Sequence, residues 1–284
     1  MPVIVVGNLV VGGSGKTPLA THLVAQLRDR GMRPGVISRG FGRQASDVRE
    51  VELTSPPTDC GDEPLLIRRR ADCPVFVAAR RVDAAHALLR AYPATDVIIA
   101  DDGLQHLRLA RDFEIAVFDG RGAGNGRLLP AGPLREPLKR LKSIDAMVAN
   151  GPSPMAGNGF FMQIEFGDLY RLAAPKLTCP AAQFASRHGA SVAAVAGIGN
   201  PLRFFDMLRT AGLAVAEHPF PDHHPFSRAD LAGITARNVV MTEKDALKCL
   251  GFDDPRIWVA PVTATVDPGL VESILEKLRG RKAA

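Results

Sequence analysis

The feature that most constrains this chain is an apolar run near the N-terminus that breaks into a glycine-rich loop. The run Val3–Val6 is rich in β-branched residues, and the loop that follows it ends in Gly15, Lys16 and Thr17. A short β-branched run bounded by glycines predicts a buried strand, and residues 19–27 have the apolar spacing of a helix. Strand, glycine loop and helix, in this order, are the context of a phosphate-binding loop.

Such a loop binds phosphate because glycines let successive backbone N–H groups converge on its oxygens, and the next helix directs its N-terminal donors at the same anion. We expect Lys16 to reach the β- and γ-phosphates and Thr17 to place a hydroxyl on Mg²⁺. One departure is Val10, which stands where the usual pattern has a glycine. An ordinary strand-to-helix turn is the alternative. The expected nucleotide-binding residues are Val11, Gly12, Gly13, Ser14, Gly15, Lys16, Thr17 and Pro18.

Two further segments supply carboxylates. Residues 96–100 form an apolar strand that runs straight into Asp101 and Asp102. P-loop enzymes keep their metal-binding acid at the end of such a strand, although caps or an Asx turn are the structural alternative. Asp62 and Glu63 open a helix, where carboxylates are often caps that complement the helix dipole.

Composition excludes several classes of protein. The chain has 284 residues, is 46% hydrophobic and carries a formal net charge of +5, without a basic stripe interleaved with aromatic residues. We therefore expect no nucleic-acid partner. The four cysteines form no C-x-x-C pair, which predicts neither a zinc site nor a disulfide framework and favours a reducing compartment. No run of about twenty apolar residues is long enough to span a bilayer.

We expect an α/β fold of two lobes. Residues 1–150 form a nucleotide-binding lobe with a mostly parallel, P-loop NTPase-like sheet flanked by helices, and residues 151–284 form a smaller α/β lobe that closes over the acceptor cleft. A long loop rich in glycine and proline, from 119 to 137, is a candidate lid or substrate loop. Its polar residues of first interest are Asn125, Arg127 and Arg135.

A loop in the second lobe, with prolines on both sides, contains Asp222, His223 and His224. These residues lack partners at metal-ligand spacing, so a general base or its electrostatic partner is the better interpretation.

Together the motifs resemble those of the tetraacyldisaccharide 4′-kinase family of lipid A biosynthesis, over nearly the whole chain. Two departures are visible. Val10 stands where the family commonly has threonine, and family members usually carry an N-terminal membrane-associating helix before the first strand, at which this chain begins. The resemblance rests on Gly7-Asn8, Val11–Pro18, Ser38–Gly42, Gly61–Pro64, Asp101–His106, Gly124–Gly126, Leu129–Pro137, Asp222-His223 and Thr242–Ala246.

The resemblance implies a kinase that uses ATP and Mg²⁺ to phosphorylate the 4′-hydroxyl of an acylated glucosamine disaccharide 1-phosphate, giving lipid IVA. It implies a cytoplasmic enzyme, peripheral at the cytoplasmic face of the bacterial inner membrane. Lys16 would act on the transferred phosphoryl group, and Asp62 would be the base, assisted by His223, which matches the family better than His224. We expect the metal to be surrounded by Thr17, Glu63, Asp101 and Asp102.

The alternative function is a P-loop nucleotide-dependent switch or regulatory ATPase, whose change of conformation matters rather than its product. A switch needs no lobe for a second substrate, so residues 151–284 favour the kinase. Measuring ATP hydrolysis with and without a lipid acceptor separates the two.

Overall fold

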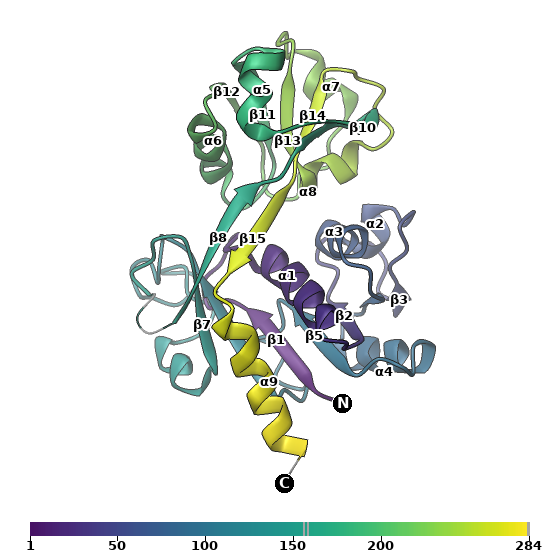
Figure 1. Cartoon of the computed structure of the whole chain (residues 1–284), viewed down its shortest axis with the longest axis vertical. Helices are drawn as coiled ribbons and strands as arrows, with labels where there is room; N and C mark the ends of the chain where they lie inside the picture. Colours follow the sequence, from purple (N-terminus) through teal and green to yellow (C-terminus); the bar gives the residue numbers. More distant parts are fainter. Residues whose placement is uncertain (156, 158, 283–284) are drawn as a thin grey trace. The chain divides into compact units, whose positions relative to one another are not determined.

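The computed structural model describes residues 1–155, 157 and 159–282, which divide into two compact units (Figure 1). The first unit contains residues 1–164 and the C-terminal segment from 264, and the second contains residues 165–263. These bounds differ from the expected division at 150/151. Strand β8 (Phe160–Phe166) pairs in parallel with β7 (Ala146–Asn150), and β15 (Val262–Val266) lies next to β8 in the same sheet. The chain therefore leaves the first sheet later than expected and returns to it at its end.

Nine described strands form the sheet of the first unit, in the order β15-β8-β7-β6-β1-β5-β2-β4-β3. Strand β1 (Val3–Gly7) lies inside it, parallel to both of its neighbours. Parallel strands align their carboxyl ends, so the loops after β1, β2 and β5 emerge at one edge. The remaining strands of this sheet are β2 (Pro34–Ser38), β3 (Arg49–Glu50), β4 (Val75–Val77), β5 (Val97–Asp101) and β6 (Phe113–Phe118).

Helices cover both faces of this sheet. Val3 and Val5 share a buried cluster with Ala84 and Leu88 of α4 (Arg81–Ala91). Because side chains alternate along a strand, Ile4 and Val6 face the opposite side. There α1 (Lys16–Asp29) contacts the sheet and neighbours α3 (Asp62–Arg70) and α9 (Gly269–Lys282). The short helix α2 (Pro57–Cys60) and the 3₁₀ segment η1 (Leu138–Ser143) complete the unit.

The second unit is a smaller α/β layer. Six described strands follow the order β10-β9-β14-β13-β11-β12. Phenylalanine side chains of α5 and α6 pack on one face of this sheet, and apolar side chains of α7 and α8 pack on the other. Its elements are β9 (Leu169–Arg171), β10 (Ala174–Cys179), α5 (Ala181–His188), β11 (Ser191–Ala196), α6 (Pro201–Thr210), β12 (Ala214–Pro219), α7 (Arg228–Ala232), β13 (Val239–Thr242), α8 (Glu243–Ala246), η2 (Leu247–Cys249) and β14 (Ile257–Ala260).

The predicted architecture, a mostly parallel sheet flanked by helices with a second, smaller α/β unit, is confirmed. Within the described residues, none of the helices combines the length and the apolar character that crossing a bilayer requires.

Candidate active site

The predicted phosphate loop connects β1 to α1. Gly12 and Gly15 have φ angles of 96° and 98°, in the region that L side chains rarely adopt. Gly15 lies directly before the first residue of α1, so the first helical N–H groups point toward the loop. Lys16, Thr17 and Pro18 form the first turn of this helix, as the sequence predicted.

Asn8, which the sequence motifs included without a role, lies at the centre of the loop. Its side chain is fully buried. Its Nδ2 donates to the carbonyl of Gly12 at 3.3 Å and to Ser14 Oγ at 3.1 Å, and its Oδ1 accepts from Lys16 Nζ at 3.3 Å. One buried amide thus holds both sides of the loop and the lysine that crosses it.

A second buried amide fixes the far end of the loop. Asn150, at the end of β7, donates from Nδ2 to the carbonyl of Ser14 at 2.8 Å. A Cβ added to Gly15 would lie 2.4 Å from the same Nδ2. This position therefore requires glycine both for its φ angle and for the close approach of Asn150.

Lys16 is held between Asn8 and Asp102. The Lys16 Nζ lies 3.6 Å from Asp102 Oδ1, and the lysine side chain is only 10% exposed. Arg135, from the proline-rich loop, donates from Nη1 to both carboxylate oxygens of Asp102 at 3.1 Å. Arg81 donates to the backbone carbonyl of Asp102 at 2.9 Å. Burial alone would raise the pKa of Asp102, but these neighbouring cations hold it below its usual range.

Asp101 is the last residue of β5 and has a different environment. It is 1% exposed, and neither of its carboxylate oxygens has a hydrogen-bond partner among the described residues. Burial, with repulsion from Glu63 and Asp102, raises its pKa to about 7. A buried carboxylate with unmatched oxygens costs free energy unless a cation or proton satisfies it.

The proline-rich loop lies along the phosphate loop. Val11 N–H donates to the carbonyl of Pro133 at 3.0 Å, and Arg135 N–H donates to the carbonyl of Leu9 at 2.7 Å. Leu134, between them, is 1% exposed. Of the polar residues singled out in this loop, Arg135 reaches the site, whereas Asn125 bonds within its own loop, to the carbonyl of Ala131. The two backbone hydrogen bonds between the loops are not visible in the sequence, because Val11 and Pro133, and likewise Leu9 and Arg135, are more than 100 residues apart.

The carboxylates of α3 lie at its first turn. Asp62 is 4% exposed, and its Oδ1 accepts from the N–H of Glu63 at 3.2 Å. The preceding Gly61 has φ 90°, and a Cβ there would lie 3.0 Å from Gly40 Cα. The loop after β2 thus packs against the start of α3. Glu63 contributes to the raised pKa of Asp101, so the structure brings these two predicted acids together.

The histidines of the second unit have distinct surroundings. The ring of His224 packs between Phe220 and Phe226, with centroids 4.7 and 4.8 Å away. His223 instead has its Nε2 3.4 Å from Lys244 Nζ and 3.8 Å from an Asp222 oxygen. The Nε2 of His224 also lies 3.3 Å from Asp230 Oδ2, so His224 packs in an aromatic cluster beside one carboxylate, whereas His223 lies among polar groups. Asp62 and His223 belong to different units, so their pairing stays a prediction.

The predicted metal surroundings, Thr17, Glu63, Asp101 and Asp102, stay a prediction. Among the described residues, no group of three or more histidine, cysteine or acidic side chains has the arrangement of a metal site. Mg²⁺ commonly binds through one or two carboxylates and keeps several waters, so a complete protein cage is not required. The unmatched oxygens of Asp101 fit such a cation. Asp102, in contrast, is already paired with two cations.

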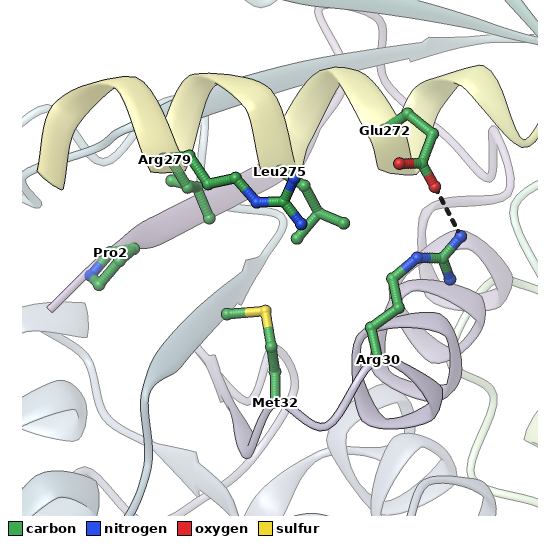
Figure 2. A pocket seen from close by; sticks show the side chains of 7 residues that line it. Pro2, Arg30, Met32, Glu272, Leu275 and Arg279 are labelled. Atoms are coloured by element: carbon green, nitrogen blue, oxygen red, sulfur yellow. Dashed lines mark hydrogen bonds and ion pairs between the residues drawn. The ribbon is translucent and has the colours of Figure 1, made fainter. Parts of the chain in front are cut away.

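A cavity of about 320 Å³ lies elsewhere in the first unit (Figure 2). Figure 2 shows Arg30 and Glu272 joined across one wall, at the end of α1 opposite to Lys16. None of the predicted site residues is among those that line it, which are Pro2, Arg30, Met32, Glu272, Leu275, Leu278 and Arg279. This cavity is therefore separate from the candidate site at the phosphate loop.

Comparisons with known proteins all match kinases of one family. Residues 1–279 match the family model described as tetraacyldisaccharide-1-P 4′-kinase, LpxK. A tetraacyldisaccharide 4′-kinase of Dechloromonas aromatica is 50% identical, over 100% of this chain and 86% of the relative. That of Methylobacillus flagellatus is 48% identical, over 98% and 82%. A crystal structure of the "apo" form of LpxK from Aquifex aeolicus in complex with ATP has a TM-score of 0.78 and 29% identity, covering 98% of this chain and 88% of that one.

Proposed function

Because the chain belongs to the tetraacyldisaccharide-1-P 4′-kinase family of lipid A synthesis, we propose the roles that its residues play in phosphoryl transfer from ATP. Family membership also decides between the kinase and the nucleotide switch in favour of the kinase. The observation that carries the proposal is the phosphate loop, in which Lys16 is held by the buried Asn8 beside Asp101 and Asp102. The acceptor is the 4′-hydroxyl of the acylated glucosamine disaccharide 1-phosphate.

Residues 11–18 bind the phosphates of ATP. The backbone N–H groups of the loop and of the first turn of α1 supply donors, and Lys16 supplies a positive charge to the transferring phosphoryl group. Since Asn8 and Asp102 hold Lys16 before nucleotide arrives, little reorganisation is needed. ATP competes with Asp102 for the lysine, and Arg135 continues to neutralise that carboxylate.

Mg²⁺ is the metal that we propose for this site, held by Asp101 and the Thr17 hydroxyl, with Glu63 and Asp102 near it directly or through water. The support is the buried, unmatched carboxylate of Asp101 at the end of β5. When bound, the ion neutralises charge on the β- and γ-phosphates. Asp101→Asn and Asp102→Asn should raise the Mg²⁺ concentration needed for half-maximal turnover. An unchanged Mg²⁺ dependence would assign both carboxylates to structure.

Asp62 is the base that we propose for the acceptor hydroxyl, with His223 as its assistant. The support is that Asp62 is almost fully buried at the start of α3, while Lys244 and Asp222 flank His223. The second unit would close over the acceptor to bring the two together. Base catalysis of this kind contributes about 10²–10⁴-fold.

A double-mutant cycle tests this pair. If Asp62 and His223 act as one unit, turnover of Asp62→Asn and of His223→Ala should each fall nearly as far as that of the double variant. His224→Ala is the matched control, because its ring packs in the aromatic cluster and should affect stability more than turnover. Fully additive losses, or loss of ATP binding in step with turnover, would contradict the pairing.

Peripheral contact with the cytoplasmic face of the inner membrane is the location that we propose. The acceptor carries acyl chains, and apolar side chains are exposed on the loop of Arg135 and on the loop of Gln105. The Gln105 side chain accepts from Arg135 Nη1 at 3.4 Å and donates to the carbonyl of Asn8 at 3.1 Å. Leu107 is 74% exposed, and Leu128 and Leu129 are 44% and 54% exposed. Replacing Leu107 by aspartate should weaken sedimentation with anionic phospholipid vesicles without changing ATP affinity. Equal sedimentation of both proteins would oppose a role for this loop.

The phosphate loop itself is tested by Lys16→Ala, assayed with ATP and the lipid acceptor. Removing one preorganised charge from the transferring group should lower turnover by at least about 10²-fold. Lys142→Ala, at an exposed lysine of the same unit, is the matched control and should retain full turnover. Near-native turnover in Lys16→Ala would show that phosphoryl transfer does not use this loop.

A further inference from the structure

Arg121 lies beside the phosphate loop, and none of the roles proposed above involves it. It follows the end of β6, two residues after Asp119. Its backbone N–H donates to Asp119 at 3.1 Å, its Nε lies 3.0 Å from both carboxylate oxygens, and its Nη2 donates to one of them at 2.7 Å. The Asp119 side chain is 8% exposed. A buried carboxylate thus fixes the plane of the guanidinium.

The guanidinium is aimed at the glycines of the loop. Its Nη2 lies 3.3 Å from the carbonyl oxygen of Gly13, and a Cβ added to Gly12 would lie 2.8 Å from its Nη1. The two N–H groups of Nη1 have no hydrogen-bond partner among the described residues. An arginine stays charged at all physiological pH values, so two donors of a fixed cation are available where the loop cradles phosphate.

The chain contains a twin of this arrangement in its second unit. Arg256 lies two residues after Asp254 and donates to it in the same way, from backbone N at 2.9 Å, Nε at 3.0 Å and Nη2 at 2.7 Å. In the twin, however, Nη1 donates to the backbone carbonyl of Ile234. In Arg256, therefore, every nitrogen donates to an acceptor of the protein, whereas the Nη1 of Arg121 has no such acceptor among the described residues.

We propose that Nη1 of Arg121 binds the terminal phosphate of ATP, which makes Arg121 a catalytic residue of the transfer. The proposal rests on the phosphate loop being the ATP site. Charge on the terminal phosphoryl oxygens is stabilised during transfer by cations that are already in place, and an arginine supplied in cis is one known form of such a cation. Asp119 supplies the positioning, because a forked ion pair fixes both distance and plane.

The alternative is that Arg121 only braces the loop through the carbonyl of Gly13. The two roles differ in their response to nucleotides. A contact to the terminal phosphate distinguishes ATP from ADP, whereas a brace affects both equally. We therefore compare Arg121→Gln, Arg121→Lys and the wild type by calorimetric titration with ATP and ADP, and by turnover with the lipid acceptor.

For Arg121→Gln we expect ATP affinity to fall about tenfold or turnover to fall about 10²–10³-fold, with ADP affinity within about twofold of the wild type. Arg121→Lys keeps the charge but not the fork, and should recover part of the loss. Arg256→Gln removes the twin and is the matched control. It should lower the melting temperature and leave turnover and the ratio of ATP to ADP affinity unchanged.

Equal weakening of ATP and ADP in Arg121→Gln, with turnover retained at saturating ATP, would overturn the proposal in favour of a brace. Wild-type values for all three measurements would overturn it as well. If Arg121→Gln fails to fold, Arg121→Lys decides by the same ratio of ATP to ADP affinity. Absence of ATP binding in the wild type, or normal turnover in Lys16→Ala, would instead refute the assignment of the phosphate loop on which this inference rests.

Discussion

Replacing Gly15 by alanine separates the two reasons for glycine at the start of α1. Gly15 has φ 98°, and an added Cβ would lie 2.4 Å from Asn150 Nδ2 and 3.0 Å from Ile164 Cδ1. Gly31, beyond the other end of the same helix, has φ 81°, but no atom lies within 4 Å of an added Cβ. Gly31→Ala therefore measures backbone strain alone, and Gly15→Ala measures strain together with crowding.

The magnitudes follow from these surroundings. A left-handed backbone costs an L residue about 1–2 kcal/mol, of which the reduced entropy of the unfolded chain returns about 0.4–1 kcal/mol. Gly31→Ala should thus cost about 1 kcal/mol. At Gly15 the Cβ also displaces the buried amide of Asn150, which adds about 1 kcal/mol for its bond to Ser14 and about 1–3 kcal/mol for overpacking. Gly15→Ala should therefore cost about 3–5 kcal/mol.

The assay is thermal unfolding of both variants, with and without ATP. For a chain of this size about 1 kcal/mol lowers the melting temperature by roughly 2–4 °C, so the two variants should differ by at least about 4 °C. ATP should stabilise the wild type and Gly31→Ala equally, and Gly15→Ala much less, since ligand stabilisation follows affinity. Equal melting temperatures of the two variants, or an undiminished stabilisation of Gly15→Ala by ATP, would refute the inference that the buried side chain of Asn150 holds the phosphate loop in place.

Three other predictions concern polar groups. Asn8→Asp places a carboxylate against Lys16 and removes two donors, so ATP affinity measured by calorimetry should fall at least about tenfold, and unchanged affinity would exclude Asn8 from positioning the lysine. Burial, followed by nearby arginines, lowers the pKa of His106, so the unfolded chain binds protons first as pH falls below about 6.5 and stability decreases. His106→Gln should make the melting temperature fall less steeply between about pH 6.5 and 5, and an identical slope would show that other groups dominate. Asp245→Asn removes the buried carboxylate that lies 3.0 Å from Lys248 Nζ, so the free energy of unfolding measured in urea should fall by about 3–5 kcal/mol. A decrease of less than about 1 kcal/mol would contradict this prediction.

The sequence by itself determined the strands, the loop and the helix whose formation depends on residues close together in the chain. The β-branched run Val3–Val6, the glycines after it and the helical spacing of residues 19–27 each act over a few neighbouring residues, and β1, the phosphate loop and α1 form where they were predicted. The strand that ends at Asp101 was predicted for the same reason. The motifs also identified the family, because residue identity at fixed spacing is itself a local property.

Only the tertiary structure decided which side chains meet these elements. Asn150 reaches Ser14 across 136 residues, and Arg121 reaches Gly13 across 108. The order of the strands brings these partners together, and no local pattern encodes that order. The same cause moved the unit boundary, since β8 extends the first sheet by pairing with β7. The tertiary structure also distinguished His223 from His224, which the sequence alone could not separate. His223 has φ 62° and its ring lies near Lys244, while the ring of His224 packs on Phe220.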